Sequence, residues 1–312
     1  FVDERIAALE QEGYQPLLLR PVSGEAQAHL LVAGSEDQFK DLRFAFGADV
    51  KAFDDLMCSL PVERVELHHF LGMDEAFVDA SLALDAPVDI YIHDYSWYCP
   101  RLTLLGKRGV YCGEPGAAGC RSCIKQTGSE LHDEVGPDIL RARSTRWLAC
   151  ARTIYAPCAD VAQRYQRVFP NMQFQVTPWE QDILPFSLPE PDAAAPHRIV
   201  VPGAIGEQKG EAILLACARH AALHDLSVEF VVVGFAGDEK PLLDTGKVFI
   251  TGAYAEEELP SLLAREAPAA AFLPSVTPET WSYSLSHMLG AGLPVLAFDL
   301  GAIAERDRKS VV

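Results

Sequence analysis

Basic residues are scarce in this chain. Its 312 residues include 26 lysines and arginines against 44 aspartates and glutamates, which gives a formal net charge of −18 at pH 7. An extended nucleic-acid surface needs clustered Lys and Arg to neutralise phosphates, so this balance argues against a nucleic-acid partner. It does not exclude a small local site for one nucleotide.

Long apolar runs are missing as well. No stretch stays apolar over the length that a bilayer span requires, and the first residues form an acidic segment rather than a basic and apolar signal peptide. The 49% hydrophobic and 22% charged residues are typical of a globular protein. We therefore expect a cytoplasmic protein with at most peripheral membrane contact.

Both ends of the sequence lack something that a complete domain normally has. The first residue is not Met, and Val2, Ile6 and Leu9 predict an opening helix that precedes the first strand. A Rossmann-like domain normally begins with a strand, so one strand is expected upstream. The chain also stops at Val312, just where a new helix should start. We expect a fragment of a longer protein.

Apolar strands alternate with amphipathic helices in both halves, which predicts an α/β fold with parallel sheets. A proline-rich stretch without periodicity, residues 184–196, predicts a linker. It would separate an N-terminal domain, residues 1–183, from a C-terminal domain, residues 197–312. The strands expected are residues 17–20, 29–32, 42–46, 65–70, 88–93, 153–156, 173–177, 199–202, 228–233, 248–251, 270–273 and 295–298. The helices expected are residues 50–59, 74–84, 137–150, 159–168, 211–224, 256–266 and 278–289.

The segment GAIGEQKG, residues 203–210, follows the first strand of the second domain and opens a helix. Gly203 and Gly206 let the backbone approach a ligand, the helix dipole favours a phosphate, and Lys209 adds a positive charge. The spacing fits neither the G-x-G-x-x-G dinucleotide fingerprint nor a Walker P-loop. The alternative is a solvated lysine on an ordinary strand–helix turn.

A second strand–turn–helix unit spans residues 274–306. Thr277 is a candidate cap, Pro278 suits a first helical turn, and Glu279 favours the positive end of the helix dipole. Trp281, Leu285 and Met288 recur at helical spacing and should face the sheet. An open helix N-terminus after a strand is also an anion site. Glu279 has a simpler interpretation, as an acidic residue that only stabilises the helix.

These two segments resemble the donor-binding core of GT-B retaining glycosyltransferases of family 4. The signature there is a glutamate, seven residues and a second glutamate, followed by a small-residue turn and G-x-P-V. Glu279 holds the first place, whereas the second falls on His287 and departs from the pattern. The Lys209 turn is similar to the family's phosphate turn, without the arginine that often precedes the lysine. The resemblance implies two Rossmann-like domains whose parallel sheets face each other across a cleft.

The resemblance also implies roles for single residues. Lys209 would hold the nucleotide diphosphate, Glu279 the hydroxyls of the donor sugar, and His287 the ribose. The donor site would further include the backbone of the segment after Glu279 and a turn near the nucleobase: Thr280, Trp281, Ser282, Gly252 and Tyr254. For the turn, a plain connection before the next helix is an equal alternative, and His287 by itself is more often a surface or core histidine.

Polar residues end two strands of the first domain. His93 and Asp94 follow an apolar strand, a position that faces the ligand crevice of parallel sheets. His93 resembles the family's first-domain histidine, which lies near the donor sugar and the reacting centre, and imidazole suits acid–base chemistry. His68 and His69 end another strand and are expected to line the same cleft. The alternative for His93 is a histidine bonded to the backbone.

Four cysteines lie close together in a glycine-rich loop, residues 99–123. Cys120 and Cys123 have the spacing of half a structural zinc site, and Cys99 and Cys112 would complete four thiolates. Some relatives that this chain resembles carry a similar segment. The alternatives are reduced thiols, or disulfides in an oxidising compartment. The loop is therefore a candidate for a structural zinc ion.

The resemblance implies a glycosyltransferase that moves a sugar from a nucleotide-diphosphate donor to a glycan or lipid-linked acceptor with retention of configuration. It implies no metal for the chemistry, and it suggests bacterial polysaccharide biosynthesis by analogy. The diphosphate would leave on the face that the acceptor attacks, stabilised by Lys209 and the helix N-terminus. Other hypotheses remain: a degenerate sugar-nucleotide binding or scaffold protein, or a GT-B-like epimerase or phosphorylase.

Overall fold

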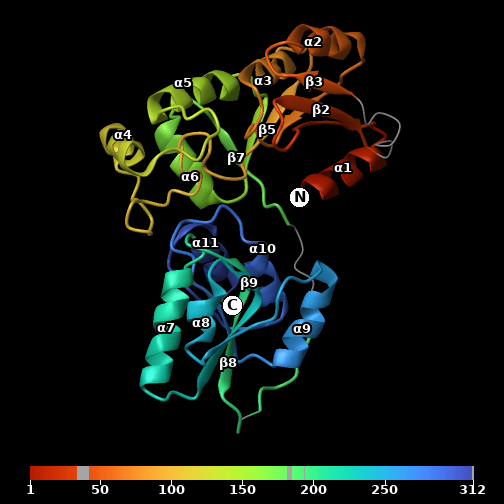
Figure 1. Cartoon of the computed structure of the whole chain (residues 1–312). Helices are drawn as coiled ribbons and strands as arrows, with labels where there is room; N and C mark the ends of the chain where they lie inside the picture. Colours follow the sequence, from red (N-terminus) through yellow and green to blue (C-terminus); the bar gives the residue numbers. More distant parts are fainter. Residues whose placement is uncertain (34–41, 181–184, 193, 311–312) are drawn as a thin grey trace. The chain divides into compact units, whose positions relative to one another are not determined.

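The computed structural model describes residues 1–33, 42–180, 185–192 and 194–310, and the chain divides into two compact units (Figure 1). Unit 1 comprises Phe1–Pro100, Ser129–Pro157 and Arg164–Trp179. Unit 2 comprises Arg101–Gly128, Cys158–Gln163 and Glu180–Val312. These units are not contiguous in sequence, unlike the linear division into residues 1–183 and 197–312. The stretch after Pro100, which holds three of the four loop cysteines, groups with unit 2.

Unit 1 contains a parallel four-stranded sheet in the order β4–β5–β6–β7. The strands are β4 (Val65–Leu67), β5 (Val88–Tyr91), β6 (Thr153–Ala156) and β7 (Phe174–Val176). The helices of this unit are α1 (Val2–Gln11), α2 (Val50–Ser59), α3 (Glu75–Leu82) and α5 (Pro137–Leu148), and α6 (Ala159–Val168) begins in unit 2 and ends in unit 1. All four residues of β5 are buried, as expected of a strand with both faces covered.

The first three strands do not join this parallel sheet. β1 (Leu17–Pro21), β2 (Gln27–Val32) and β3 (Arg43–Ala45) form a separate antiparallel sheet in which Leu19 is the partner of Leu30. The prediction of parallel strands was wrong for this part. Five residues join β1 to β2, which is enough for a hairpin, whereas a parallel crossover needs about a dozen or more.

Unit 2 is built on a parallel five-stranded sheet in the order β10–β9–β8–β11–β12. The strands are β8 (His197–Ile205), β9 (Val228–Ala236), β10 (Val248–Ile250), β11 (Ala270–Leu273) and β12 (Val295–Ala297). The helices are α4 (Gly116–Thr127), α7 (Glu211–Leu223), α8 (Glu239–Leu243), the 3₁₀ helix η1 (Glu256–Glu258), α9 (Leu259–Glu266), α10 (Tyr283–Gly290) and α11 (Gly301–Ser310). The predicted strands of this half are confirmed. The helices α4, α8 and α11 were not predicted, and α11 begins at Gly301, whereas a new helix was expected only at Val312.

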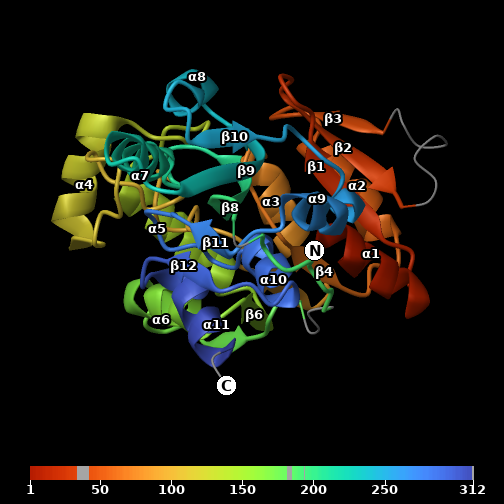
Figure 2. The ribbon, with the colours of Figure 1, turned by 90° about the horizontal axis from the view of Figure 1, so that it is seen from below.

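Neighbouring residues of the central strand bury opposite faces of this sheet. Val201 packs in a cluster with Leu214 of α7, whereas Val200 packs in another with Leu263 of α9 and Met288 of α10. The ribbon accordingly has α7 on one side of β8 and β9 and α9 on the other (Figure 1). A second view shows α10 and α11 beside β12 (Figure 2). The sheet is therefore covered on both faces, and its polar loops are at the strand ends.

The helices are short. The helix α7 has 13 residues, and α5 has 12. Within the ranges that the structure describes, no helix combines the length and the apolar character needed to cross a membrane.

Candidate functional site

The sheet of unit 2 reverses its order between β8 and β11. From β8 the chain moves outward through β9 and β10, then returns to the other side of β8 to form β11 and β12. In open parallel sheets, ligands bind outside the carboxyl ends of the strands at such a reversal. Lys209 lies in the loop after β8 and Glu279 in the loop after β11. Both predicted donor-site residues therefore lie at this reversal.

Gly210 lets these two loops pack tightly together. Its φ is +79°, and a Cβ atom there would lie 2.0 Å from the carbonyl oxygen of Pro274. The backbone N–H of Val276 also donates to the carbonyl oxygen of Gln208 at 3.0 Å. Any side chain at position 210 would separate the loops, so this glycine is required by close approach as well as by its backbone conformation.

The other two glycines of the predicted phosphate loop have different surroundings. Gly203 lies within β8 as the partner of Gly234, whose own Cβ atom would come 2.2 Å from the oxygen of Gly203. Gly206 follows the last residue of β8, and its carbonyl oxygen accepts from the N–H of Glu211 at 3.2 Å. Gly203 thus belongs to a close contact between two strands, and Gly206 to the turn that starts α7.

Lys209 and Glu279 form an ion pair. Lys209 Nζ lies 2.7 Å from Glu279 Oε1, although 70 positions separate them in the sequence. Ser275 Oγ donates a hydrogen bond to the same carboxylate oxygen. The Lys209 side chain is 36% exposed and the Glu279 side chain 14% exposed. The arrangement therefore offers a reachable positive charge beside a carboxylate that accepts hydrogen bonds, which suits a ligand with both phosphate and hydroxyl groups.

The helix after Glu279 begins later than its sequence predicts. α10 starts at Tyr283, with Ser282 as N-cap, so Thr277 is not a cap and Pro278 and Glu279 are not in a first helical turn. Ser282 has φ +101°, in a region that non-glycine residues rarely adopt, and its Oγ accepts from the N–H of Leu285 at 3.4 Å. The predicted helix over residues 278–289 was wrong at its start.

Packing explains the late start. A Cβ atom at Gly301, where α11 begins, would lie 2.7 Å from the Cα atom of Pro278 and 2.8 Å from the backbone nitrogen of Glu279. The N–H of Ala302 donates to the carbonyl oxygen of Glu279 at 2.9 Å. The start of α11 therefore packs against the backbone of Glu279 and binds its carbonyl oxygen. These contacts hold residues 277–279 outside the helix that their sequence favours.

A polar network supports the start of α10. Glu180 accepts a hydrogen bond from the indole nitrogen of Trp281 at 2.8 Å and another from Ser286 Oγ. Arg306 donates to the carbonyl oxygen of Ser282 at 2.8 Å and to Ser286 Oγ at 2.6 Å, and its guanidinium lies 3.7 Å from the centre of the Trp281 ring. Trp281, Leu285 and Met288 are all buried. Leu285 and Met288 lie on α10 and pack against strand residues, as predicted, whereas Trp281 precedes the helix.

Sequence reasoning missed the residues that support the predicted site, which are Glu180, Ser275, Gly301 and Arg306. No short motif contains them, and their contacts span up to about a hundred positions. Ser275 is four residues before Glu279, and that proximity was the one signal in the sequence that pointed to a contact.

The predicted nucleobase contacts follow β10, just before η1, and the predicted ribose contact lies on α10. His287 Nε2 is 3.3 Å from Glu256 Oε1, whose side chain is largely exposed. Gly252 has φ +87°, and its N–H donates to the carbonyl oxygen of Gly234 at 2.9 Å. Tyr254 packs against the core beneath α9, and burial raises the pKa of its hydroxyl. The structure gives each of these residues a protein contact, and their ligand roles stay predictions.

In unit 1, the ends of β4 and β5 bring four polar side chains together. His68 Nδ1 and His93 Nε2 are 3.2 Å apart, and His69 Nε2 lies 2.8 Å from Asp94 Oδ2. Burial, followed by the neighbouring His68, lowers the pKa of His93 to about 3, so its ring is neutral near pH 7. Burial would raise the pKa of Asp94, but the contacts with His69 and Ser96 together outweigh it and the pKa is lowered. The predicted pairing of the two strand ends is thus present as a cluster of one carboxylate and three imidazoles.

The cysteine segment is more ordered than the predicted loop. Cys120 and Cys123 lie on the helix α4, and Leu105 and Tyr111 form an antiparallel bridge. Burial raises the pKa of Cys112, and the other two thiols raise it further. In the described part of the chain, no three Cys, His, Asp or Glu side chains are grouped closely enough to hold a metal ion. The described residues therefore do not assemble the zinc site that was predicted from Cys99, Cys112, Cys120 and Cys123. Cys120 and Cys123 are three positions apart on α4 and so lie on one side of that helix.

Two surface hollows of unit 2 lie away from these residues. One is lined by Ala216, Cys217, His220, Ala221, Leu226, Val228 and Phe230, and the other by Arg219, Asp238, Lys240, Pro241, Asp244 and Thr245. Neither includes Lys209 or Glu279, so the candidate site rests on the reversal of strand order and not on a hollow.

Comparisons with known proteins give matches to solved structures. No protein-family model and no curated protein matches the chain. The pneumococcal O-GlcNAc transferase GtfA, in complex with UDP and GlcNAc, is similar at a TM-score of 0.52 and 13% identity, over 91% of this chain and 55% of that one. A variant of TarM from S. aureus, in complex with fondaparinux, alpha-GlcNAc-glycerol and UDP, is also similar. Its TM-score is 0.51 and its sequence identity 11%, over 91% of this chain and 50% of that one.

A third similar structure is HepE from Anabaena in complex with UDP-glucose. It has a TM-score of 0.50 and 16% identity, over 82% of this chain and 64% of that one. The chain thus spans between half and about two thirds of the length of these neighbours. At such low identity the likeness concerns the fold. The chain has the GT-B fold of these glycosyltransferases, with two Rossmann-like α/β units, as the sequence predicted.

Proposed function

We propose that this protein is a glycosyltransferase that binds a nucleotide-diphosphate sugar on unit 2 and transfers the sugar, with retention, to a glycan or lipid-linked acceptor. The observation that carries the proposal is the ion pair of Lys209 and Glu279 at the reversal of the strand order, 2.7 Å between Nζ and Oε1. Solved structures of the same fold that hold UDP or UDP-glucose support a nucleotide-sugar donor.

Lys209 and the start of α10 are assigned to the diphosphate. The ammonium group is a compact charge that complements phosphate oxygens, and the first N–H groups of α10 have no partners within the helix. Their dipole favours a negative charge at this end. As the bond from the sugar to the diphosphate breaks, negative charge grows on the leaving oxygens, and these preorganised groups stabilise it. No metal ion takes part in this scheme.

Glu279 is assigned to the sugar. Its carboxylate pairs with Lys209 and accepts a hydrogen bond from Ser275. A bound diphosphate competes for Lys209, and a carboxylate oxygen is then available to sugar hydroxyls, which are hydrogen-bond donors. One ion pair thus couples the binding of the phosphate group to the binding of the sugar.

His93 is assigned a hydrogen bond to a ligand hydroxyl, the role that the family resemblance implies. Its neutral ring has one acceptor nitrogen and one donor nitrogen, which suits this task better than a permanent charge. The retention of configuration, the assignment to family 4 and a place in bacterial polysaccharide biosynthesis belong to the same proposal and rest on the resemblance.

A second candidate function is nucleotide-sugar binding without turnover. It is favoured by His287, which stands where the family signature has a glutamate and which contacts Glu256 at 3.3 Å. An imidazole offers a ribose different hydrogen-bond geometry from a carboxylate. This candidate shares the donor site and differs only in whether sugar is transferred.

The test is calorimetric titration of UDP, GDP, dTDP, ADP and their sugars into the full chain, with Lys209→Met and Glu279→Gln beside it. We expect one nucleotide to bind selectively and Lys209→Met to weaken it by about tenfold to a hundredfold, the cost of a lost charged hydrogen bond. Glu279→Gln should keep the bare nucleotide and lose the extra affinity for its sugar form.

A matched control is Lys240→Met, because Lys240 also pairs with a carboxylate, Asp244, but is 81% exposed and lies on α8. It should leave binding unchanged. Release of nucleotide diphosphate only in the presence of a glycan acceptor would distinguish transfer from binding alone. An epimerase would consume the donor without an acceptor, and a phosphorylase would require phosphate. If no nucleotide binds at millimolar concentration, the proposal fails.

A further inference from the structure

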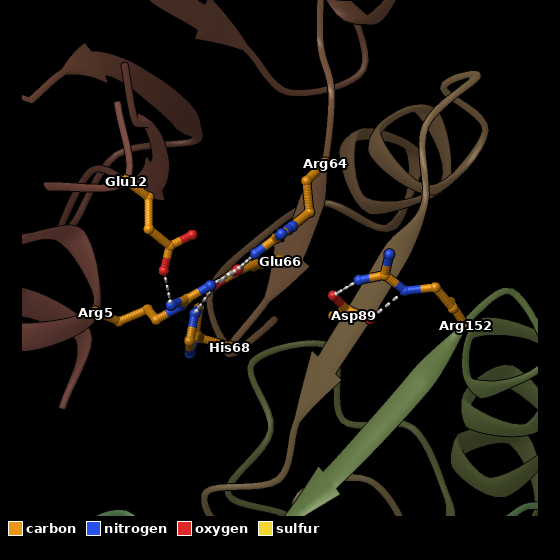
Figure 3. A network of polar contacts seen from close by, with 7 residues as sticks. All are labelled: Arg5, Glu12, Arg64, Glu66, His68, Asp89 and Arg152. Carbon is orange, nitrogen blue, oxygen red and sulfur yellow. Dashed lines mark hydrogen bonds and ion pairs between the residues drawn. The ribbon is translucent and has the colours of Figure 1, made fainter. Parts of the chain in front are cut away.

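A buried carboxylate lies behind the histidine cluster of unit 1. The side chain of Glu66, on β4, is 10% exposed and is surrounded by basic groups (Figure 3). Arg5 donates to it through Nε at 3.0 Å and Nη2 at 2.7 Å, and Arg64 donates through Nη1 at 3.3 Å. His68 Nε2 lies 3.5 Å from Oε2. Two arginines would suffice to neutralise one carboxylate, so the third contact, to His68, calls for a different explanation.

His68 connects this carboxylate to His93. Its Nε2 faces Glu66, and its other nitrogen, Nδ1, lies 3.2 Å from His93 Nε2. The ring is stacked on Tyr91 with centroids 4.5 Å apart and an interplanar angle of 14°, which fixes its orientation. The three side chains thus form a line from a carboxylate through one imidazole to a second imidazole.

The charges along this line determine where the protons reside. Burial would raise the pKa of Glu66, but the contacts from His68 and Arg5 lower it to about 2, so the carboxylate is ionised and only accepts hydrogen bonds. A proton on His68 Nε2 faces that negative charge. In the neutral ring, His68 Nδ1 is then an acceptor, and the hydrogen bond to His93 requires a proton on His93 Nε2.

We propose that Glu66 and His68 are positioning residues that hold His93 in one tautomer, with its proton on Nε2 and its acceptor lone pair on Nδ1. The second nitrogen of a functional histidine commonly sets which nitrogen carries the proton, and here that partner is another histidine backed by a carboxylate. The tautomer decides whether His93 presents a donor or an acceptor through its remaining nitrogen. In this arrangement Nδ1 is the acceptor nitrogen of the ring.

The consequence for activity rests on the proposed function, in which His93 contacts a ligand hydroxyl. With the opposite tautomer, the same nitrogen would donate, and a hydroxyl would have to accept instead. Tyr91 packs on His68 and Trp179 packs on His93, which limits the rotation of both rings and keeps Nε2 of His93 directed at His68. The tautomer is therefore a structural property of unit 1 that exists before any ligand binds.

The test is two-bond ¹H–¹⁵N correlation NMR of the full chain labelled in its histidines. It is recorded without ligand at pH 8, where ordinary imidazoles are neutral. The resonances of His93 are assigned from His93→Gln. We expect a protonated Nε2 and a bare Nδ1 in the wild type. His68→Phe keeps a ring to stack on Tyr91 but removes both nitrogens, and it should give a mixture of tautomers at His93.

The matched pair Glu66→Gln and Asp89→Asn tests the carboxylate. Both replace a buried carboxylate that pairs with arginine by its amide, and the two positions are partners in the β4–β5 register (Figure 3). Only Glu66 contacts His68, so only Glu66→Gln should reduce the population of the Nε2 tautomer. If Glu66→Gln does not fold, as judged by circular dichroism, Glu66→Asp takes its place, because the shorter carboxylate lies further from His68.

Three results would overturn the proposal: a proton on Nδ1 of His93 in the wild type, an unchanged single tautomer in His68→Phe, or equal effects of Glu66→Gln and Asp89→Asn. None of these measurements involves a nucleotide or a sugar. A protein that binds no nucleotide sugar yet shows the predicted tautomer would refute the proposed transferase and leave the positioning role of His68 intact.

Discussion

The substitution Gly301→Ala tests whether the backbone of Glu279 is fixed by α11. Gly301 has φ +62°, and an added Cβ atom would lie 2.7 Å from the Cα atom of Pro278 and 2.8 Å from the nitrogen and oxygen of Glu279. These neighbours are backbone atoms, which move only together with their loop. The substitution should therefore both destabilise unit 2 and displace Glu279 from Lys209.

Gly292→Ala is a close control for this change. Gly292 has φ +67°, nearly the same conformation, but no atom lies within 4 Å of its added Cβ. Both substitutions carry the penalty of a left-handed backbone, about 1–2 kcal/mol. Only Gly301→Ala adds an overpacking term, typically about 1–3 kcal/mol. The difference between the two variants isolates the contact with the Glu279 loop.

The assay is thermal unfolding, followed by titration with the nucleotide and its sugar. For a unit of this size, about 1 kcal/mol corresponds to about 2–4 °C in Tm. We expect Gly301→Ala to melt about 2–12 °C below Gly292→Ala and to lose the affinity difference between nucleotide and nucleotide sugar. Equal melting temperatures for the two variants would show that α11 does not hold the loop, and the account of the late start of α10 would then be wrong.

Three further predictions concern single residues. Lys209→Met should raise the Kd for a nucleoside diphosphate by about tenfold to a hundredfold, and calorimetry that shows no change would remove Lys209 from the phosphate site. Because the pKa of His93 is lowered to about 3 from an ordinary 6.5, the folded protein binds fewer protons than the unfolded chain between these values, and stability falls as the pH drops through this window. His93→Gln should therefore make the denaturation midpoint depend less on pH between 6.5 and 4. If this dependence is the same as in the wild type, the result would argue against a buried neutral ring. Ser282→Gly should be at least as stable as the wild type, because glycine relieves the strained backbone and caps a helix nearly as well as serine. Ser282→Ala should lose about 1 kcal/mol of stability. If chemical denaturation shows Ser282→Ala to be the more stable of the two, this backbone is not strained.

Much of the fold follows from local patterns in the sequence. The apolar runs of β8, β9 and β11 and the helix α7 were predicted within a few residues, because a buried parallel strand and an amphipathic helix each have a periodicity that needs no knowledge of distant residues. The positions of Lys209 and Glu279 after strands were predicted for the same reason. The histidines after β4 and β5 were also expected on one edge of a sheet.

The errors fall on segments whose sequence pattern is compatible with more than one structure. β1 and β2 form a hairpin because only five residues join them, although their apolar patterns resemble those of parallel strands, and β3 pairs with β2 in the same antiparallel sheet. The cysteine spacing suggested a metal loop, but Cys120 and Cys123 belong to the helix α4. The apolar pattern of a segment does not distinguish a parallel from an antiparallel strand, and the cysteine spacing does not distinguish a loop from a helix.

The sequence by itself determined that the chain is α/β, where its central strands lie, and which polar side chains follow them, because these properties depend on hydrophobic period and on local backbone preferences. Only the tertiary structure decided that Lys209 meets Glu279 across 70 positions, that Gly301 holds the Glu279 loop out of a helix, and that Glu66 reaches His93 through His68. These contacts arise from close packing between segments far apart in the chain. Packing of that kind overrides local propensity, and no short stretch of sequence encodes it.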